Sequence, residues 1–464
     1  MSAEATPRAV EQQAGSCPEG ILTRECLAEL AASGRVETVA LAIPDLEGRL
    51  LGKRLTAEHF LADVADHGAE GCQYLLASDV EMAPIAGNEL VGWTTGFGDM
   101  MLRPDLTTAR LLPWEPGSAL VLADAFDLAS GDPVAVAPRQ VLRGQLDRLA
   151  ARGLSANAST ELEFIAFHTS FREAWERRYR DLRPAVPYNS DYAIFDGGGI
   201  EPLVARIRAE MQAAGMTVEG SKGECNFGQH EVNFRYGEAL RIADEHVVYK
   251  AGAKEIARQS GMALTFMAKY DEREGSSCHI HLSLTGPDGA SAFAADRRLL
   301  EMFVAGQLAC LGELTLLLAP HVNSYKRFVD KSFAPTVVAW GYDNRTCPIR
   351  VVGHGEGLRF EHRLPGADVN PYLAIAAAIA AGIHGIEDEL ELEPPVEGDA
   401  YATDKPRIPS TLNDACEAFA ASEVARRAFG DGVVDHLLAR AHGEVAAAAG
   451  VVSEWERVRG FERL

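Results

Sequence analysis

The stretch Cys278-His279-Ile280-His281-Leu282-Ser283 alternates apolar and polar side chains. In a β-strand, residues two positions apart point to the same face, so both histidines and the serine share a face opposite the apolar residues. Two other stretches follow the same rule, Glu161-Leu162-Glu163 and Arg359-Phe360-Glu361-His362-Arg363. Carboxylates, imidazoles and guanidinium groups on one sheet face are costly to bury without partners. The pattern therefore predicts a site for cations or for a charged ligand.

The composition indicates a folded protein without a general affinity for nucleic acid. The chain has 464 residues, 47% hydrophobic and 24% charged, with a formal net charge of −23. This length allows two or more domains, and the negative charge argues against binding to nucleic acid or to an anionic membrane. The eight cysteines include no C-x-x-C pair, so we expect reduced thiols. Residues 1–20 lack an apolar leader and Tyr372–Ile386 is interpreted as a buried helix, so we expect a cytoplasmic protein.

The order of predicted elements indicates an α+β protein with two domains. Residues 1–20 are small and polar and predict a disordered tail. Residues 21–135 predict a β-rich domain, with strands expected at Val36–Ile43, Leu50–Leu55, Tyr74–Val80 and Ala119–Phe126. Residues 136–464 predict a larger domain, in which the charged strands lie between helices expected at Pro138–Arg152, Ile200–Ala214, Ile242–Gly261, Asp296–Leu318 and Leu412–Phe461.

The charged segments supply six candidate metal ligands, five of them carboxylates: Glu161, Glu163, Glu224, Glu231, His279 and Glu361. Oxygen-rich ligation with a single imidazole suits Mg²⁺ or Mn²⁺ better than zinc. Five carboxylates exceed the charge of one divalent ion. They therefore indicate at least two ions together with a polyphosphate, as in phosphoryl-transfer sites.

Arginines accompany these carboxylates, namely Arg327, Arg345, Arg350, Arg359 and Arg363. Guanidinium groups bind phosphate and carboxylate through two parallel hydrogen bonds. Any one of these arginines alone is better explained as a surface salt bridge. Surface salt bridges do not explain the whole set, because the charges recur on alternating strand faces. The set therefore indicates a site for anionic substrates.

The combined motifs resemble glutamine synthetases of the type I branch over about residues 36–420. No single motif is specific, but together they are. The matching segments are Glu161-Leu-Glu163, Glu224 to Glu231 with Gly228-Gln229-His230, Gly275 to Ser283, Asn323-Ser-Tyr-Lys-Arg327, Asn344-Arg-Thr346, Arg359 to Arg363 and Asp368-Val-Asn-Pro-Tyr-Leu373.

The resemblance implies an N-terminal β-grasp domain and a C-terminal catalytic domain whose antiparallel sheet forms the active-site barrel. It also implies a dodecamer of two stacked hexameric rings, with each active site between neighbouring subunits. The implied reaction is ATP-dependent phosphorylation of the γ-carboxylate of L-glutamate, followed by attack of an amine on γ-glutamyl phosphate.

The resemblance further implies a role for each motif residue. Glu163, Glu224 and Glu231 would hold one metal ion, and Glu161, His279 and Glu361 the other. Glutamate would be bound by Gly275, Arg327 and Arg363. ATP and the transferring phosphoryl group would face a third set, with Arg345 catalytic: His281, Ser283, Arg345, Arg350, Arg359 and, on the adenine side, Phe234.

Two segments depart from the ammonia-using members of the family. Those enzymes close the site with a glutamate, which here falls on Phe333 in the stretch Arg327–Pro335. Their neighbouring-subunit loop carries an aspartate, whereas Gln73–Ser78 has no acid, and Asp79 and Glu81 follow it. Loss of both carboxylates disfavours ammonium and favours an alkyl group on the nitrogen. We therefore predict a glutamate–amine ligase that acts on a primary organic amine.

The apolar Phe333 favours a small amine such as ethanolamine, with Tyr74 and Tyr192 beside it in the amine pocket. Glu274 is a catalytic candidate that would orient the amine or receive its proton. Three alternatives stay open: a ligase for putrescine or spermidine, an ordinary ammonia-using glutamine synthetase, and a non-catalytic sensor or scaffold. The family's adenylylated tyrosine would correspond to Tyr401, but its sequence context is missing here, so we do not expect that control.

Overall fold

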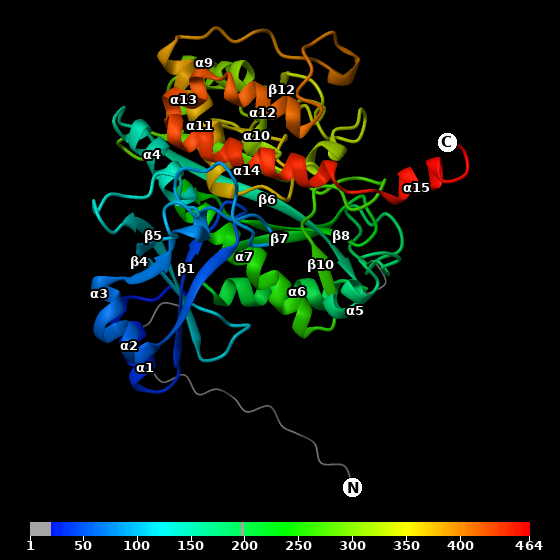
Figure 1. The fold of residues 1–464 in the computed structure, drawn as a ribbon. Helices are drawn as coiled ribbons and strands as arrows, with labels where there is room; N and C mark the ends of the chain where they lie inside the picture. Colours follow the sequence, from blue (N-terminus) through cyan, green and yellow to red (C-terminus); the bar gives the residue numbers. More distant parts are fainter. Residues whose placement is uncertain (1–19, 196–198) are drawn as a thin grey trace.

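The N-terminal part of the chain forms a five-stranded mixed sheet (Figure 1). Residues 20–195 and 199–464 are described in this computed structural model. The strand order is β2-β1-β5-β4-β3, in which β1 is parallel to β5 and the other pairs are antiparallel. The elements are α1 Arg24–Ala32, β1 Thr38–Pro44, β2 Leu50–Thr56, α2 Ala57–His59, α3 Ala65–His67, β3 Ala69–Cys72, β4 Asp99–Leu111 and β5 Ser118–Asp127.

The segment Tyr74–Val80, expected as a strand, forms no strand. It begins in a 3-10 helix, Gln73–Leu76, and continues into a turn. Asp79 closes the turn, because its carboxylate accepts the backbone N–H groups of Glu81 at 2.9 Å and Ala83 at 2.8 Å. The apolar Leu76 is fully buried without strand pairing. The prediction of a strand was therefore wrong. Of the tail expected at residues 1–20, only Gly20 lies within the described residues.

The second sheet is larger and, apart from the parallel pair β12–β13, antiparallel. Its order is β12-β13-β14-β11-β6-β8-β7, and β9 and β10 also pair with β6. This confirms the expected α+β class. The β-grasp assignment and the domain boundary near residue 135 stay predictions. The strands are β6 Ser155–Phe167, β7 Val218–Gly223, β8 Gln229–Phe234, β9 Gly237–Glu238, β10 Ala263–Thr265, β11 Cys278–Thr285, β12 Trp340–Tyr342, β13 Ile349–Val352 and β14 Arg359–His362.

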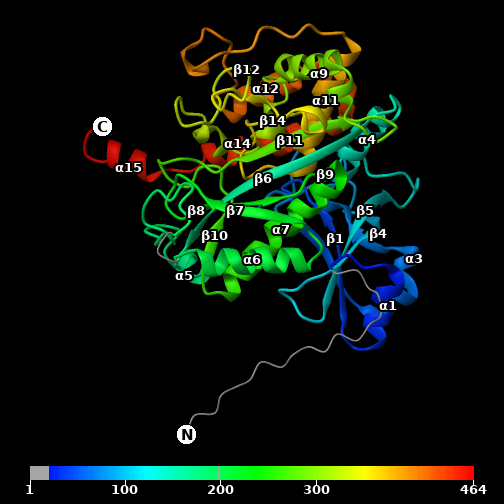
Figure 2. The ribbon, with the colours of Figure 1, turned by 180° about the vertical axis from the view of Figure 1, so that it is seen from behind.

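In both ribbon views (Figures 1 and 2), α9 and α11 lie towards the top of the picture and α6 and α7 towards the bottom, with the long strand β6 between them. These and the remaining helices are α4 Pro138–Ala150, α5 Phe171–Glu176, α6 Glu201–Ala213, α7 Ala239–Gln259, α8 Ala292–Ala295, α9 Arg297–Cys310, α10 Thr315–Leu318, α11 Pro371–Glu387, α12 Leu412–Ala420, α13 Glu423–Phe429, α14 Asp431–Ala449 and α15 Glu454–Gly460.

The apolar face of the second sheet packs against α7 and α9. Phe303 of α9 meets Phe360 of β14 with ring centroids 5.8 Å apart. Tyr249 of α7 reaches the sheet through Phe266, which contacts Phe164 of β6 at 5.9 Å. Because apolar and charged residues alternate along these strands, the charged face points away from this core.

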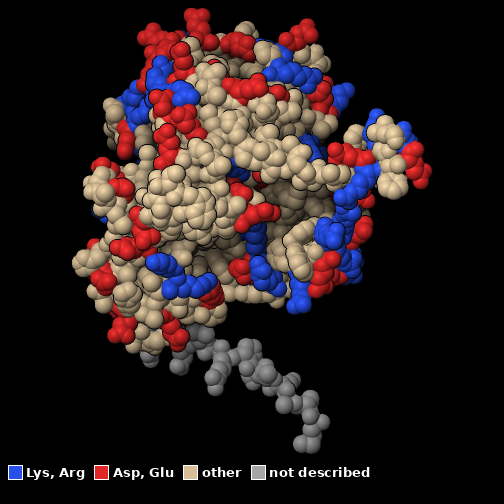
Figure 3. Space-filling model, in the orientation of Figure 1, with Lys and Arg blue, Asp and Glu red and all other residues tan. Residues whose placement is uncertain are grey.

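The surface and the cysteines bear on the expectations from composition. Acidic and basic side chains are interspersed over the face drawn in Figure 3. Among the described helices, none combines the length and the apolar character needed to span a bilayer.

Six cysteines are free thiols, whereas Cys26 is disulfide-bonded, so the expectation of reduced thiols fails for Cys26. Cys17 lies outside the described residues.

Two ion-pair networks join the N-terminal sheet to the rest of the chain. Arg139 at the start of α4 is 2% exposed and contacts Asp244 of α7 at 2.7 Å. The same guanidinium also contacts Asp124 of β5 at 2.8 Å and Asp105 of β4 at 2.9 Å. A buried arginine with three carboxylates fixes the relative placement of these elements, because removal of Arg139 would leave the buried Asp244 without its ion pair.

The second network centres on Glu47 in the turn between β1 and β2. Arg440 of α14 contacts its carboxylate at 2.6 Å, and Nε2 of His321 lies 3.2 Å from it. Burial alone would lower the pKa of His321, but its hydrogen bonds to Glu444 and Glu47 raise that pKa to about 9. His321 therefore carries a positive charge at neutral pH.

This raised pKa predicts a pH-dependent contribution of His321 to stability. The folded-state pKa lies above that of the unfolded chain, so the contribution is complete below pH 6.5 and is lost as the pH rises through about 9. We expect His321→Asn to lower the free energy of unfolding by about 2 kcal/mol in mildly acidic buffer. Urea titrations should show this deficit shrinking towards alkaline pH, and a constant deficit would contradict the assignment.

Candidate functional site

The strand register brings the charged residues into direct cross-strand pairs. Between β6 and β8, Glu163 faces Glu231, and between β6 and β11, Glu161 faces His279. Between β11 and β14, His281 faces Glu361. Cβ atoms of directly opposed residues lie about 5 Å apart. The charged face predicted from alternation is therefore one continuous surface across four strands.

Three carboxylates gather at one end of this surface. Glu163, Glu224 and Glu231 each place a carboxylate oxygen within 4.8 Å of the others. Glu163 is oriented by Ser277, whose backbone N–H and hydroxyl donate to it at 2.8 and 2.5 Å, and by the Gln229 amide at 2.8 Å. A carboxylate fixed in this way by its neighbours is typical of a metal ligand.

The crowding of these carboxylates requires a cation. Glu231 is 3% exposed, and burial together with the charges of Glu161 and Glu163 raises its pKa to about 8. The ammonium group of Lys222 contacts Glu224 on the side of the pocket. One lysine cannot neutralise three carboxylates, so a divalent cation fits the donor set.

A second group of ligands lies farther along the same face. Oxygen and nitrogen atoms of Glu161, His281 and Glu361 lie within 4.8 Å of one another. His279, the ligand expected from the sequence, is also in place, because its Nδ1 lies 3.3 Å from both Glu161 and Glu361. The pKa of Glu361 falls to about 2 because His279 and Arg363 outweigh the effect of burial. Both histidines therefore qualify as ligands.

Arginine donors point at the same space. Arg327 is 3% exposed, and one of its terminal nitrogens donates to the carbonyls of residues 363–365. Arg363 contacts Glu361 at 2.6 Å. Among the described residues, neither Nε atom has a hydrogen-bond partner. Two buried donors without acceptors fit a ligand carboxylate.

Gly275 allows Arg327 to take this position. A Cβ atom at Gly275 would lie 2.5 Å from Cγ of Arg327 and 2.5 Å from the carbonyl oxygen of Ala268. Any larger residue would therefore displace the arginine. The predicted partners of glutamate thus lie together in the structure.

These side chains line a pocket of about 580 Å³. It contains most of the predicted site, namely Glu161, Glu163, Glu224, Glu231, Glu274, Gly275, His279, Arg327, Phe333, Arg345, Arg350, Glu361, Arg363 and Tyr192. His281 and Arg359 lie next to it, since Arg359 donates to Nδ1 of His281 at 3.1 Å. Ser283 follows two residues later on the same face of β11.

Two predicted residues lie elsewhere. Phe234 is three residues from Glu231, so strand alternation places it on the apolar face, where its ring packs against Tyr249 at 4.9 Å. This position does not suit the adenine contact expected for it. Tyr74 lies in the 3-10 helix of the N-terminal part and does not line this pocket.

The flap that carries Phe333 is tied down from outside. Phe333 is 57% exposed with φ of 59°. Asp330 contacts Arg407 at 2.9 Å and accepts the Thr336 hydroxyl at 2.6 Å. The Tyr401 hydroxyl donates to the carbonyl of Ala334 at 3.0 Å, and burial raises the pKa of this tyrosine to about 12. Tyr401 therefore fixes the flap next to Phe333.

Sequence reasoning missed several residues of the pocket: Asp191, Lys222, Cys225, Gln229 and Ser277. The sequence pattern allows Gln229 to be placed in the pocket, because it shares the strand face of Glu231 two residues away. No sequence pattern places Asp191 there, because it lies in a loop whose path depends on tertiary contacts.

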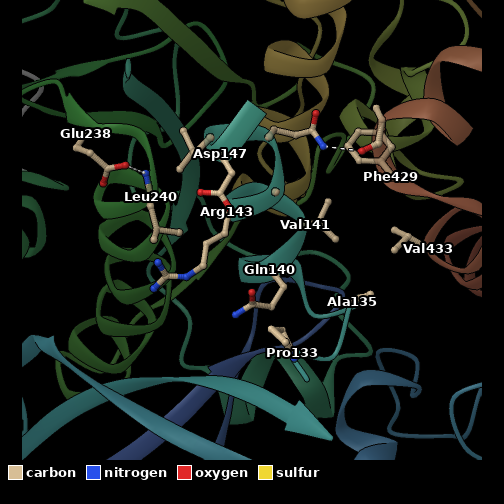
Figure 4. A pocket seen from close by; sticks show the side chains of 14 residues that line it. Pro133, Ala135, Gln140, Val141, Arg143, Asp147, Glu238, Leu240, Phe429 and Val433 are labelled. Carbon is tan, nitrogen blue, oxygen red and sulfur yellow. Dashed lines mark hydrogen bonds between the residues drawn. The ribbon is translucent and has the colours of Figure 1, made fainter. Parts of the chain in front are cut away.

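Another hollow, of about 660 Å³, lies between α4, the start of α7 and the α13–α14 junction (Figure 4). Several of its polar groups already have partners in the protein. Arg143 contacts Asp105 and Asp124 at 3.1 Å, and the Gln145 amide donates to the carbonyl of Ala428. Glu238 caps the start of α7. The charged pocket is therefore the better candidate.

Comparison with known proteins gives a consistent result. Residues 135–459 match the family described as glutamine synthetase, catalytic domain. The chain is 54% identical to γ-glutamylethanolamide synthetase GlnA4 of Streptomyces coelicolor, over 95% of this chain and 96% of the relative. It is 34% identical to glutamate–isopropylamine ligase of a Pseudomonas species, over 91% and 95%. A solved structure described as a GmaS/ADP complex superposes with a TM-score of 0.82 at 27% identity, covering 94% of this chain and 99% of that one.

The raised pKa of Glu231 predicts opposite effects with and without metal. A folded-state pKa of about 8 lies above the ordinary 4.5, so metal-free stability falls as the pH rises between these values. At alkaline pH, Glu231→Gln should therefore stabilise the metal-free protein by on the order of 2 kcal/mol. It should also remove most of the stabilisation that MgCl₂ gives the parent protein.

Thermal unfolding with EDTA and with MgCl₂ measures both effects. Glu219→Gln removes the same charge from an exposed position on β7 and should behave like the parent protein. If Glu231→Gln kept the full response to MgCl₂, Glu231 would not be a ligand.

The contact from Tyr401 predicts that Tyr401→Phe loosens the flap. Loss of one hydrogen bond should cost about 1 kcal/mol of stability. Because the contact is next to Phe333, which is expected to line the amine pocket, the KM for the amine should rise. The KM for ATP should be unchanged. Steady-state kinetics would check this, with Tyr236→Phe at a 60% exposed position as the control. An equal rise in both KM values would contradict the flap assignment.

Proposed function

Because this chain belongs to the glutamine synthetase family, we propose that it is an ATP-dependent ligase that joins the γ-carboxylate of L-glutamate to a primary organic amine, with ethanolamine as the best candidate. The observation that carries this proposal is the pocket itself. It combines crowded carboxylates and free arginine donors with an apolar Phe333 on the flap. The 54% identical relative named as a γ-glutamylethanolamide synthetase supports the choice of amine.

The carboxylate groups would hold two divalent ions, Mg²⁺ or Mn²⁺. Glu163, Glu224 and Glu231 would form one site, and Glu161, Glu361 and His279 the other. Such ions neutralise phosphate charge during phosphoryl transfer. The crowding that raises the pKa of Glu231 supports this assignment.

The arginines and Gly275 would position the two anionic substrates. Arg327 and Arg363 have buried Nε donors that fit the carboxylates of glutamate. Arg345, Arg350 and Arg359, together with His281 and Ser283, would face the phosphates of ATP. A γ-carboxylate oxygen then attacks the terminal phosphorus as ADP leaves. Arg345 would stabilise the charge on the transferring phosphoryl group.

In the second half of the reaction, the amine nitrogen attacks the carbonyl carbon of γ-glutamyl phosphate, phosphate leaves, and Glu274 would receive the proton that the nitrogen loses. Phe333 and Tyr192 would contact the carbon chain of the amine.

A second candidate function, a ligase for putrescine or spermidine, is favoured by one observation. Glu274 and Asp191 both line the pocket, and of these two acids only Glu274 was expected from the sequence. A diamine would place its distal ammonium against such a carboxylate.

We also propose a homo-oligomer, a dodecamer of two hexameric rings, that acts in the cytoplasm. Tyr74 lies away from the pocket of its own chain, so an amine contact from Tyr74 would have to come from a neighbouring subunit. The six free thiols fit a reducing compartment, whereas the disulfide at Cys26 does not. Mass photometry would test the assembly.

An amine panel tests the proposed reaction. With Mg²⁺, ATP and glutamate, we expect phosphate release with ethanolamine, weaker release with putrescine and little with ammonium, because no flap carboxylate receives ammonium. Arg345→Ala should abolish release with every amine. Release with ammonium alone would identify an ordinary glutamine synthetase, and no release with any amine would favour a non-catalytic relative.

A further inference from the structure

Asp191 lies in a loop that strand β7 holds against the pocket. The neighbouring Ser190 is 2% exposed. A Cβ atom at Gly223, the last residue of β7, would lie 2.3 Å from the Ser190 carbonyl oxygen. The backbone N–H of Tyr192 donates to the Gly223 carbonyl at 3.3 Å, and Asn189 accepts the N–H of Asp191 at 2.9 Å. Because Glu224 follows Gly223 directly, these contacts place Asp191 beside it.

Among the described residues, the Asp191 carboxylate is paired with a neutral donor and not with a basic side chain. Its carboxylate accepts a long hydrogen bond from the Cys225 thiol, with sulfur and oxygen 3.6 Å apart. Burial and the Asp191 charge raise the pKa of Cys225 to about 11, so the thiol stays neutral. Across the described residues, no lysine, arginine or histidine forms an ion pair with Asp191. Among the described residues, Asp191 therefore lines the pocket without an ion pair to a basic side chain.

The same corner already accommodates a primary ammonium group. Nζ of Lys222 contacts Glu224 and lies 4.8 Å from the centroid of the Tyr192 ring. A carboxylate and an aromatic face are favourable partners for an ammonium group. Asp191 is within 4.8 Å of Glu224 and lines the same pocket as Phe333. An alkylammonium would therefore find a carboxylate on the loop and an apolar surface on the flap.

We propose that Asp191 determines specificity for cationic primary amines by binding the ammonium group of the incoming amine. This inference rests on the proposed ligase function. Phe333 on the flap cannot offer an acidic contact to the amine. Asp191, on a loop outside the charged strands, would make that contact instead. The substrate class that follows is a monoamine that is charged at neutral pH. Glu274, a further acid of the pocket, keeps the role of orienting the amine or receiving its proton.

A metal role for Asp191 is less favourable. Asp191, Glu224 and Cys225 are close enough to hold an ion. However, the thiol is neutral, Asp191 is exposed, and Glu224 also belongs to the more deeply buried group with Glu163 and Glu231. Hard divalent cations prefer the all-carboxylate group.

Two nucleophiles of different charge test the proposal. At neutral pH ethanolamine is a cation, whereas hydroxylamine is uncharged and gives γ-glutamyl hydroxamate. We expect Asp191→Asn to raise the KM for ethanolamine about tenfold, the size of one charge-assisted hydrogen bond. The KM values for ATP and glutamate and the rate of hydroxamate formation should stay within about twofold of the parent enzyme, because neither depends on this charge. Asp191→Glu, which keeps the charge, should retain most of the affinity for ethanolamine.

Asp181→Asn is the matched control, because it removes the same charge from an exposed residue of the same connecting segment. An equal loss with both nucleophiles, or an unchanged KM for ethanolamine, would overturn the proposal. An increased requirement for Mg²⁺ in Asp191→Asn would also overturn it in favour of a metal ligand. If the parent enzyme formed neither the amide nor the hydroxamate, the proposed function itself would fail.

Discussion

The direct pairing of Glu163 with Glu231 across β6 and β8 is the constraint on which the rest of the site depends. Two carboxylates at adjacent positions of a buried sheet repel each other strongly. The structure answers this repulsion locally: the pKa of Glu231 is raised, Ser277 and Gln229 donate to Glu163, and Lys222 contacts Glu224. The protein is thus prepared for a divalent ion, and part of the free energy of metal binding offsets charge crowding already present in the fold.

The second half of the charged face is compensated differently. Glu361 is 1% exposed, but Arg350 and Arg363 contact it at 2.7 and 2.6 Å. Its pKa is lowered, whereas the pKa of Glu231 is raised. One end of the surface therefore has a single lysine against three carboxylates, whereas the other already has two arginines in place. The first end thus depends more strongly on a bound cation than the second.

The charged face of the sheet could be predicted from the sequence because strand alternation is a local rule, whereas the metal-ligand roles stay predictions. Strand alternation places Glu161, His281 and Glu361 on one face. The same rule, counted over three residues from Glu231, places Phe234 on the opposite face, away from these side chains. The turn at Asp79 was harder to foresee, because the preceding apolar run is buried by tertiary packing and not by a partner strand. The placement of Asp191 depends on the contact between Ser190 and Gly223, which are 33 positions apart in the chain. No local pattern encodes such a contact.

The division between strands and loops also separates two kinds of constraint on the chemistry. A one-residue shift in β6, β8 or β11 would move the charged residues of that strand to the apolar face, so the groups proposed for metal and phosphate depend on the register of the sheet. Phe333 and Asp191 lie in loops that approach the pocket independently, one held by Tyr401 and the other by Gly223. Changes in these loops leave the register intact. The proposed contacts to the amine can therefore change without moving the strand residues proposed to hold metal ions and phosphate.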